Sequence, residues 1–146
     1  MPFAHLMFTT PPSPALREAA ADTLRNGIAG ALSALIATRL RKRSDLVALR
    51  VEPVPAAQWT IGGTPLQDAA QAGAHLQVQV SAGTNTAAEM EAFVAEAFAL
   101  LESRLGPLHP ASYVVVQELP ATAWGWGGRT QHGRRLEQGA TAPAGR

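Results

Sequence analysis

The pattern of hydrophobic and polar positions divides the chain into two similar halves. Each half opens with a short strand: residues 3–8 are mostly apolar, and residues 76–80 alternate between apolar positions and glutamine. Strict alternation is typical of a strand that has one face in water. In each half the strand is followed by apolar residues at helical spacing, which predicts one long amphipathic helix. A further apolar, β-branched strand follows each helix.

The helix boundaries carry their own signals. In the first half, Ser13 is placed to cap the helix and Pro14 occupies the favoured first helical position. In the second half, Thr86 and Glu89 have the spacing of a capping box, and Gly106 ends the helix. A strand–helix–strand connection implies parallel strands and a right-handed crossover, so we expect each half to be a β-α-β unit.

A glycine-rich segment closes each half and is predicted to form a tight hairpin. The first segment is Trp59-Thr60-Ile61-Gly62-Gly63 and the second is Trp124-Gly125-Trp126-Gly127-Gly128. Since one helix covers only one face of a small sheet, the two halves packed together make the smallest reasonable unit. We therefore expect an α+β fold with one domain over residues 1–128, built from units at 2–66 and 73–128. Residues 129–146 are expected to be an arm or a disordered tail.

Composition restricts the classes of function. The chain has 146 residues, a formal net charge of +1 and no cysteine. A nearly neutral chain gives no general reason to expect nucleic acid as a partner, and the lack of cysteine excludes disulfides and thiolate chemistry. The histidines are far apart in the sequence, so we expect no metal and no other cofactor. No apolar run reaches membrane-spanning length, and we expect a cytoplasmic protein without a membrane partner.

One basic cluster, at residues 39–43, stands out against this nearly neutral background. We expect it to be the solvated end of the first helix, where cations complement the helix dipole. The alternative is that it binds an anionic partner, and such an association would be weak and strongly dependent on salt.

Pro2 is the candidate for chemistry. If Met1 is removed, which a small following residue generally permits, Pro2 carries a free secondary amine. An α-amino group ordinarily has a pKa of about 8, and burial in an apolar site lowers that pKa by disfavouring the ammonium form. A buried amino-terminal proline can therefore act as a general base or a nucleophile near neutral pH. The alternative is a common second residue on a frayed terminus.

Pro2 at the start of a strand, a β-α-β unit and a closing aromatic–Gly–Gly hairpin together resemble the tautomerase superfamily. Because the unit occurs twice, the chain is similar to the fused 4-oxalocrotonate tautomerases and to cis-3-chloroacrylic acid dehalogenase. The resemblance covers nearly the whole chain apart from the tail. It implies a homotrimer of double units in which Pro2 moves a proton between oxygen and carbon of an enol, without a cofactor. Only the first half supplies this amine, because the matching position, near Ala74, is internal to the chain.

The resemblance also implies which residues bind a substrate. Arg50 matches the arginine that the family places in the second strand, and Tyr113 is taken as its counterpart in the second half. A further arginine normally follows the first strand, but the matching positions here are about Pro12 and Thr84. The missing arginine argues against a dicarboxylate substrate.

The aromatic and acidic residues near the strand ends have two interpretations each. Trp59, Trp124 and Trp126 match the aromatic wall of the family's apolar pocket, and they are equally suited to core or interface packing. Glu118 resembles the glutamate that activates water in the dehalogenase group. A structural role at the end of a strand is the favoured interpretation of Glu118.

The preferred hypothesis is a keto–enol tautomerase that uses Pro2 on a small enol carboxylate, either a 2-hydroxy-dienoate or an arylenolpyruvate. Alternatives within enzymes are a hydratase or dehalogenase using Pro2 with Glu118, and a decarboxylase on the same scaffold. The alternative outside enzymes is a trimeric binding protein that has kept the fold and lost catalysis.

Overall fold

The computed structural model describes residues 1–10, 14–66 and 70–140, with the backbone alone described at 14–24, 139 and 140. The elements in chain order are β1 (Phe3–Thr10), α1 (Pro14–Arg39), β2 (Ala48–Pro55), β3 (Thr60–Ile61), β4 (Thr64–Pro65), β5 (Ala74–Ser81), α2 (Ala87–Leu105), β6 (Tyr113–Leu119), β7 (Gly125–Trp126), β8 (Arg129–Thr130) and α3 (Gln131–Ala140). Short 3-10 turns at Ser44–Leu46 and Ala56–Gln58 lie on either side of β2.

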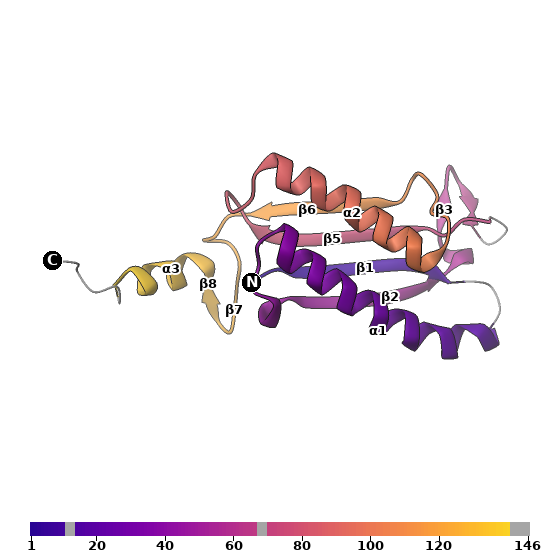
Figure 1. Ribbon diagram of the computed structural model, residues 1–146, viewed down its shortest axis with the longest axis horizontal. Coiled ribbons are helices and arrows are strands. Elements are labelled where there is room, and N and C mark those ends of the chain that lie inside the picture. The colour runs from indigo at the N-terminus through magenta and orange to yellow at the C-terminus, as the bar shows by residue number, and fades with distance from the viewer. Residues whose placement is uncertain (11–13, 67–69, 141–146) are drawn as a thin grey trace.

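A four-stranded sheet in the order β2-β1-β5-β6 forms the centre of the molecule. β1 is parallel to β2 and β5 is parallel to β6, whereas the two halves meet where β1 runs antiparallel to β5, with Leu6 opposite Leu76. Helices α1 and α2 lie side by side across one face of this sheet (Figure 1). The prediction of an α+β fold made of two β-α-β units is therefore confirmed.

The core lies between the sheet and these two helices. Alternate residues of the central strands are buried against apolar stripes of the helices: Ala4, Leu6 and Phe8 of β1, Leu76, Val78 and Val80 of β5, Ile28, Leu32 and Ile36 of α1, and Phe93, Ala97 and Leu101 of α2. Each fully buried Leu, Ile or Phe contributes about 1.5–3 kcal/mol to folding. This layer holds β1 firmly, and Pro2 directly precedes β1.

The helix ends agree with the sequence as far as they are described. Thr86 and Glu89 form the predicted capping box at the start of α2, and the backbone turns at Gly106 with φ 84°. α1 is described from Pro14 onward, and the expected cap Ser13 lies outside the described residues. Neither helix, nor α3, has the length and apolar character needed to cross a membrane within the described residues.

The two glycine-rich segments are hairpins. β3 pairs with β4 and β7 pairs with β8, each antiparallel around a Gly-Gly turn. The turn glycines have φ of 59° and 82° at Gly62 and Gly63, and of 57° and 72° at Gly127 and Gly128. Two successive left-handed residues are what a two-residue hairpin turn requires, and glycine adopts this conformation without steric cost.

The region expected to be an arm or tail contains a helix. Residues 131–140 form α3, which begins directly after β8 and extends away from the sheet (Figure 1). Residues 141–146 lie outside the described residues. The reason for α3 is found in its contacts with the second hairpin, which belong to the site described next.

Candidate active site around Pro2

A pocket with a volume of about 440 Å³ opens at the start of β1. Pro2 is buried in its wall. The other lining residues come from the ends of four strands and from the second hairpin: Met1, Phe3, Ala48, Gln79, Leu119, Trp124, Gly125 and Trp126. The proline of the first half is thus enclosed by the hairpin of the second half.

The sheet register explains why the hairpin of the second half lies over the proline of the first half. Because β1 and β5 are antiparallel, the end of β5 lies beside the start of β1. β6 is parallel to β5 and ends with Leu119 opposite Ser81, so the hairpin that follows β6 emerges next to Pro2. By the same geometry the first hairpin emerges at the other end of the sheet.

The side chain of Trp124 is fixed by a hydrogen bond across this end of the sheet. Its indole Nε1 donates to Oγ of the buried Ser81 at 3.2 Å. A buried indole N–H normally finds such a partner, since leaving it unpaired is costly. Trp124 therefore presents its apolar ring to the pocket in a defined orientation.

Trp126, the second aromatic of the pocket, is covered by an arginine of α3. The guanidinium carbon of Arg134 lies 3.8 Å from the centroid of the Trp126 ring, and Nη2 donates to the Trp126 carbonyl at 2.8 Å. A cation–π contact of this kind contributes about 0.5–2 kcal/mol. The Trp126 ring and the Arg134 side chain therefore hold each other in place.

The remaining contacts of α3 attach its first turns to the same hairpin. The backbone N–H groups of Gln131, His132 and Gly133 donate to Trp124 O at 3.0 Å, to Ala121 O at 2.9 Å and to Thr130 Oγ1 at 3.1 Å. Arg129 of β8 forms an ion pair with Glu137 of α3. These contacts satisfy the otherwise unpaired donors at the start of a helix, which accounts for helical structure in a glycine- and glutamine-rich segment.

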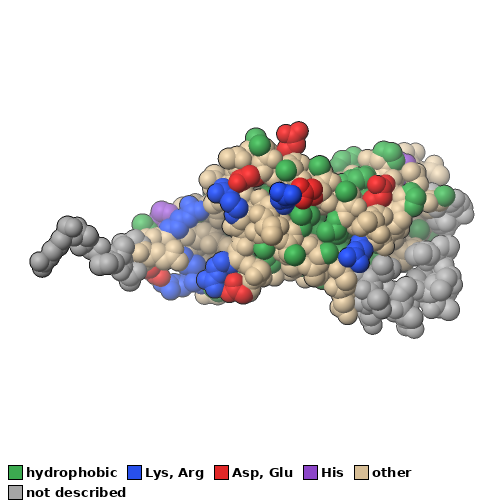
Figure 2. Space-filling model, viewed as in Figure 1, with side chains coloured by type: hydrophobic (Ala, Val, Ile, Leu, Met, Phe, Trp, Pro, Cys, Tyr) green, Lys and Arg blue, Asp and Glu red, His purple; other side chains and the backbone are tan. Residues whose placement is uncertain are grey.

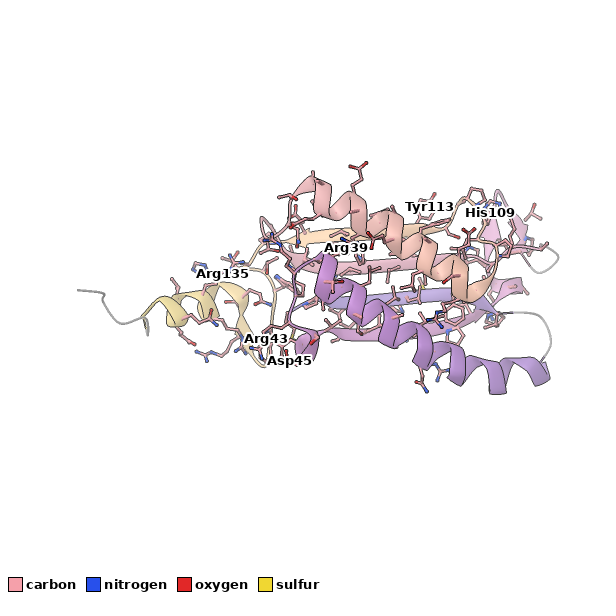
Figure 3. The ribbon with its side chains drawn as sticks, in the orientation of Figure 1. Arg39, Arg43, Asp45, His109, Tyr113 and Arg135 are labelled. Atoms are coloured by element: carbon pink, nitrogen blue, oxygen red, sulfur yellow. The ribbon has the colours of Figure 1, made fainter. Side chains whose placement is uncertain are left out.

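Positive charge surrounds the amino terminus. Burial lowers the pKa of the Met1 amine below its ordinary value of 8.0, and the charges of Lys42, Arg134, Arg135 and Arg43 lower it further. Figure 2 shows Lys and Arg side chains gathered at the end of the molecule that carries α3, and Figure 3 places Arg135 and Arg43 there. These surroundings shift an amine toward its neutral, basic form.

The cations of this region differ in whether a carboxylate forms an ion pair with them. Among the described residues, Arg41 pairs with Glu89 and Arg43 pairs with Asp45, whereas no carboxylate forms an ion pair with Lys42, Arg134 or Arg135. Lys42 Nζ donates instead to Thr84 Oγ1 at 2.9 Å. Burial lowers the pKa of Lys42, as does the charge of Arg41, while Glu89 raises it. The arginines of the 39–43 cluster are exposed and paired, as a solvated helix end predicts, whereas Lys42 is half-buried and acts on the amino terminus.

Arg50 is not part of this pocket. It lies on β2, on the same face as the pocket residue Ala48 but farther along the strand, opposite His5. Its Nη2 forms an ion pair with Glu52 at 3.0 Å, and Glu52 also bonds to His5 Nε2 at 3.0 Å. The Arg50 side chain is exposed at 65%.

Glu118 is also outside the pocket. Its register partner is Val80, which is buried on the helix-covered face of the sheet, whereas the pocket opens on the other face. The Glu118 carboxylate accepts a hydrogen bond from the Gly83 backbone N–H at 2.9 Å. This contact fixes the turn between β5 and α2, which is the structural role that the sequence favoured.

Trp59 and Tyr113 line a second pocket, also of about 440 Å³, at the opposite end of the sheet. It repeats the first pocket without its amine: Trp59 stands in the place of Trp124, and His75 in the place of Phe3. The nitrogen of Ala74 is an amide whose N–H donates to Ser112 Oγ at 3.1 Å. An amide nitrogen carries no free electron pair for proton transfer, so Ala74 cannot take the part of Pro2. The titratable side chains that line the second pocket are His75 and Tyr113.

The register corrects one match made from the sequence. Tyr113 pairs with His75 at the start of β6, just as Ala48 pairs with Phe3 at the start of β2. Both stand at the same spacing before the hairpin tryptophan of their half, so Tyr113 is the counterpart of Ala48 and not of Arg50. Figure 3 shows Tyr113 far from Arg135 and Arg43, at the other end of the molecule.

The fold is shared with solved structures, although no protein-family model and no curated protein matches this sequence. The native fused 4-OT superposes with a TM-score of 0.73 at 19% identity, covering 92% of this chain and 98% of that chain. The chain has the fold of a fused 4-OT. A second solved structure, described as a fused 4-OT symmetric trimer, matches with a TM-score of 0.72 at 18% identity. The match covers 90% of this chain and 98% of the other chain.

A macrophage migration inhibitory factor-like protein from Entamoeba histolytica has the same fold. Its TM-score is 0.67 at 16% identity, with coverage of 88% of this chain and 97% of that chain. The resemblance to the tautomerase superfamily is thus confirmed at the level of the fold.

Proposed function

We propose that the protein is a cofactor-independent keto–enol tautomerase that uses the amine of Pro2 on a small enol carboxylate, a 2-hydroxy-dienoate or an arylenolpyruvate. The observation that carries this proposal is the burial of Pro2 in a tryptophan-walled pocket at an amino terminus surrounded by cations. Removal of Met1 transfers the free amine to Pro2, which lies deeper than Met1. Desolvation and positive charge then favour the neutral base.

The reaction requires one group that first accepts and then returns a proton. The neutral Pro2 amine accepts the proton of the enol hydroxyl, which leaves an enolate with its negative charge on oxygen. As the electron pair on oxygen forms the carbonyl, the electrons of the carbon–carbon double bond take the proton from the Pro2 ammonium, which restores the amine. Nearby cations stabilise the negative charge that develops on oxygen, and the walls of Trp124 and Trp126 limit access of water.

The test compares forms of the protein that differ only at the amine. Intact mass first establishes that Met1 is absent from the active protein. Ketonisation of phenylenolpyruvate and of 2-hydroxymuconate is then followed for the wild type, for Pro2→Ala and for a form with Gly-Ser placed before Pro2. The extended form keeps every side chain but turns the Pro2 nitrogen into an amide. We expect losses of about 10²–10⁴ in kcat for the two altered forms; equal rates in all three would overturn the proposal.

We further propose that the protein is a homotrimer. Solved fused 4-OT structures are described as symmetric and asymmetric trimers. In this chain, the sheet face opposite α1 and α2 exposes large apolar side chains, among them Phe3 at 42%, Tyr113 at 61% and Val115 at 36%. Light scattering coupled to size-exclusion chromatography measures the assembly directly, and a monomer at micromolar concentration would contradict the proposal.

A further inference from the structure

We propose that helix α3 holds the carboxylate of the substrate, with Arg134 and Arg135 in the role that the sequence assigned to Arg50. This inference rests on the proposed function, because it concerns the substrate of the Pro2 pocket. It goes beyond that function by making the C-terminal helix, outside the two β-α-β units, the element that determines which substrates bind.

The first support is the way in which α3 is attached. Backbone hydrogen bonds, the Arg129–Glu137 ion pair and the stacking of Arg134 on Trp126 all connect this helix to the hairpin that forms the pocket wall. A helix that only ended the chain would not need contacts of this number with one hairpin. The attachment holds Arg134 against Trp126 of the pocket wall, and the charges of Arg134 and of the next residue, Arg135, both act on the amino terminus.

The second support is the unused donor capacity of these arginines. Arg134 is held by one Nη2 hydrogen bond and by its stacked face, and its Nε is buried with no hydrogen-bond partner among the described residues. Arg135 is exposed and forms no ion pair with a described carboxylate. A guanidinium presents its donors in a planar fork that matches a carboxylate, so both side chains are suited to bind one.

The third support is the charge balance of the pocket entrance. Arg134, Arg135 and Lys42 all act on the amino terminus, and Arg135 also acts on Lys42. The charges of Glu89 and Glu118 partly offset that of Lys42, but none of the three cations forms an ion pair with a described carboxylate. An anion bound among them therefore relieves the remaining repulsion. A substrate with one carboxylate supplies that charge next to the base that acts on it.

Arg50 lacks these properties. Its guanidinium is already paired with Glu52, which is itself bonded to His5, and the charge of Arg50 is not among those that act on the amino terminus. To reach a ligand, the Arg50 side chain has to give up this pair. The described structure therefore offers two arginines on α3 that form no ion pair with a described carboxylate, and an arginine on β2 that is paired with Glu52.

The experiment measures binding, so that it does not depend on turnover. Isothermal titration calorimetry is performed with phenylpyruvate, a stable keto acid, and with phenylacetone, which lacks the carboxylate. The central variant is Arg135→Gln, because Arg135 takes no part in attaching α3. The double variant Arg134→Gln/Arg135→Gln and the conservative Arg135→Lys complete the series. Arg104→Gln is the matched control: it removes the same charge from an exposed site at the end of α2, at the far end of the sheet.

We expect Arg135→Gln to raise the Kd of phenylpyruvate by about tenfold, and the double variant to raise it by about 10- to 100-fold. The α3 variants should bind phenylacetone as tightly as the wild type does, and Arg104→Gln should bind both ligands as tightly as the wild type does. Arg135→Lys should recover part of the affinity for phenylpyruvate. Increasing salt should weaken phenylpyruvate binding less in the double variant than in the wild type.

The outcomes separate this inference from the proposed function. An unchanged Kd in both α3 variants would overturn the inference, as would a loss confined to Arg50→Gln or a wild type that does not bind phenylpyruvate. A loss of phenylacetone binding together with phenylpyruvate would show that α3 acts only through the pocket's shape, and would also overturn it. If binding follows the expectation while Pro2→Ala turns over enol substrates at the wild-type rate, the inference stands and the proposed function fails.

Discussion

The indole N–H of Trp124 donates to the hydroxyl of Ser81 at 3.2 Å, and this contact fastens the second hairpin to the end of β5. Ser81 is buried, and its carbonyl accepts a further hydrogen bond from Thr84 Oγ1 at 2.6 Å. The end of β5 lies beside the start of β1, so a contact within the second half determines the shape of the pocket around Pro2.

Replacing Ser81 by alanine should therefore affect both stability and activity. The indole N–H loses its partner, and we expect the free energy of unfolding to fall by about 1 kcal/mol and KM to rise as Trp124 becomes less ordered. Urea unfolding and steady-state kinetics measure the two effects. Trp124→Phe removes the donor and keeps an aromatic ring, so the effects of Ser81→Ala and Trp124→Phe should not add in the double variant. Additive losses would mean that the hydrogen bond has no such role.

The pH dependence of activity should report the charges around the amine. Burial and the neighbouring cations lower the pKa of the Met1 amine from 8.0, and we expect the same surroundings to lower the pKa of the Pro2 amine once Met1 is removed. Since the neutral amine is the active form, kcat/KM should rise with pH through this lowered pKa and reach its plateau below the range of an ordinary α-amine. Replacing Lys42 by glutamine removes a cation that disfavours the ammonium form, so the pKa rises and the rising limb moves to higher pH.

A charge removed far from the amine distinguishes the effect of Lys42 on the pKa from an effect of the protein's net charge. Arg104→Gln also removes a positive charge, but at the far end of the sheet, and should leave the pH profile in place. High salt should move the wild-type profile in the direction of Lys42→Gln, because screening weakens the same repulsion. An identical profile for the wild type and Lys42→Gln would contradict the electrostatic origin of the shift.

Much of the fold follows from local patterns in the sequence. The alternation at residues 76–80, the capping signal of Thr86 with Glu89 and the Gly-Gly turns each depend on a few neighbouring residues, and the structure has the strand, helix start and hairpins that they predict. The likeness between the halves extends these local signals to the whole domain.

Which residues form the site is decided by contacts between segments that are far apart in the sequence. Which tryptophans meet Pro2 is decided by the antiparallel pairing of β1 with β5, which brings Trp124 and Trp126 to the pocket and leaves Trp59 at the other end. Helix α3 is held by contacts with a hairpin, and Leu136 is the one large apolar residue in its short, glycine- and glutamine-rich sequence. For this reason the sequence does not single out the arginines of α3, whereas Arg50 matches the family's arginine by its position in the second strand.

The capping box offers a test of helix stability away from the pocket. Thr86→Ala removes the acceptor for the Glu89 N–H and should lower the free energy of unfolding by about 1 kcal/mol. The pKa of Glu89 is lowered chiefly by its hydrogen bond from the Thr86 N–H, with smaller contributions from Asn85 and Arg41. The stabilisation is thus present above the ordinary pKa of 4.5 and is lost as pH falls through the lowered one.

Glu89→Gln should accordingly be less stable than the wild type at pH 7 and should approach it as the pH falls well below 4.5. Glu91→Gln, at an exposed position of the same helix, is the control and should follow the wild type in thermal unfolding at every pH. A constant difference between Glu89→Gln and the wild type across this range would show that the charge of Glu89 is not what stabilises the helix start.

The two hairpins provide a matched pair for separating stability from activity. Gly128 and Gly63 have similar left-handed backbones, with φ of 72° and 82°, and at neither residue would an added Cβ meet another group within 4 Å. Alanine at either position is strained by about 1–2 kcal/mol without any steric clash, so both variants should lose similar stability in urea unfolding. Only Gly128 lies in the hairpin that carries Trp126 and α3, whereas Gly63 lies in the hairpin beside the pocket that has no amine. We therefore expect Gly128→Ala to lower kcat/KM and Gly63→Ala to leave it unchanged, and equal losses in the two variants would place the reaction elsewhere than the Pro2 pocket.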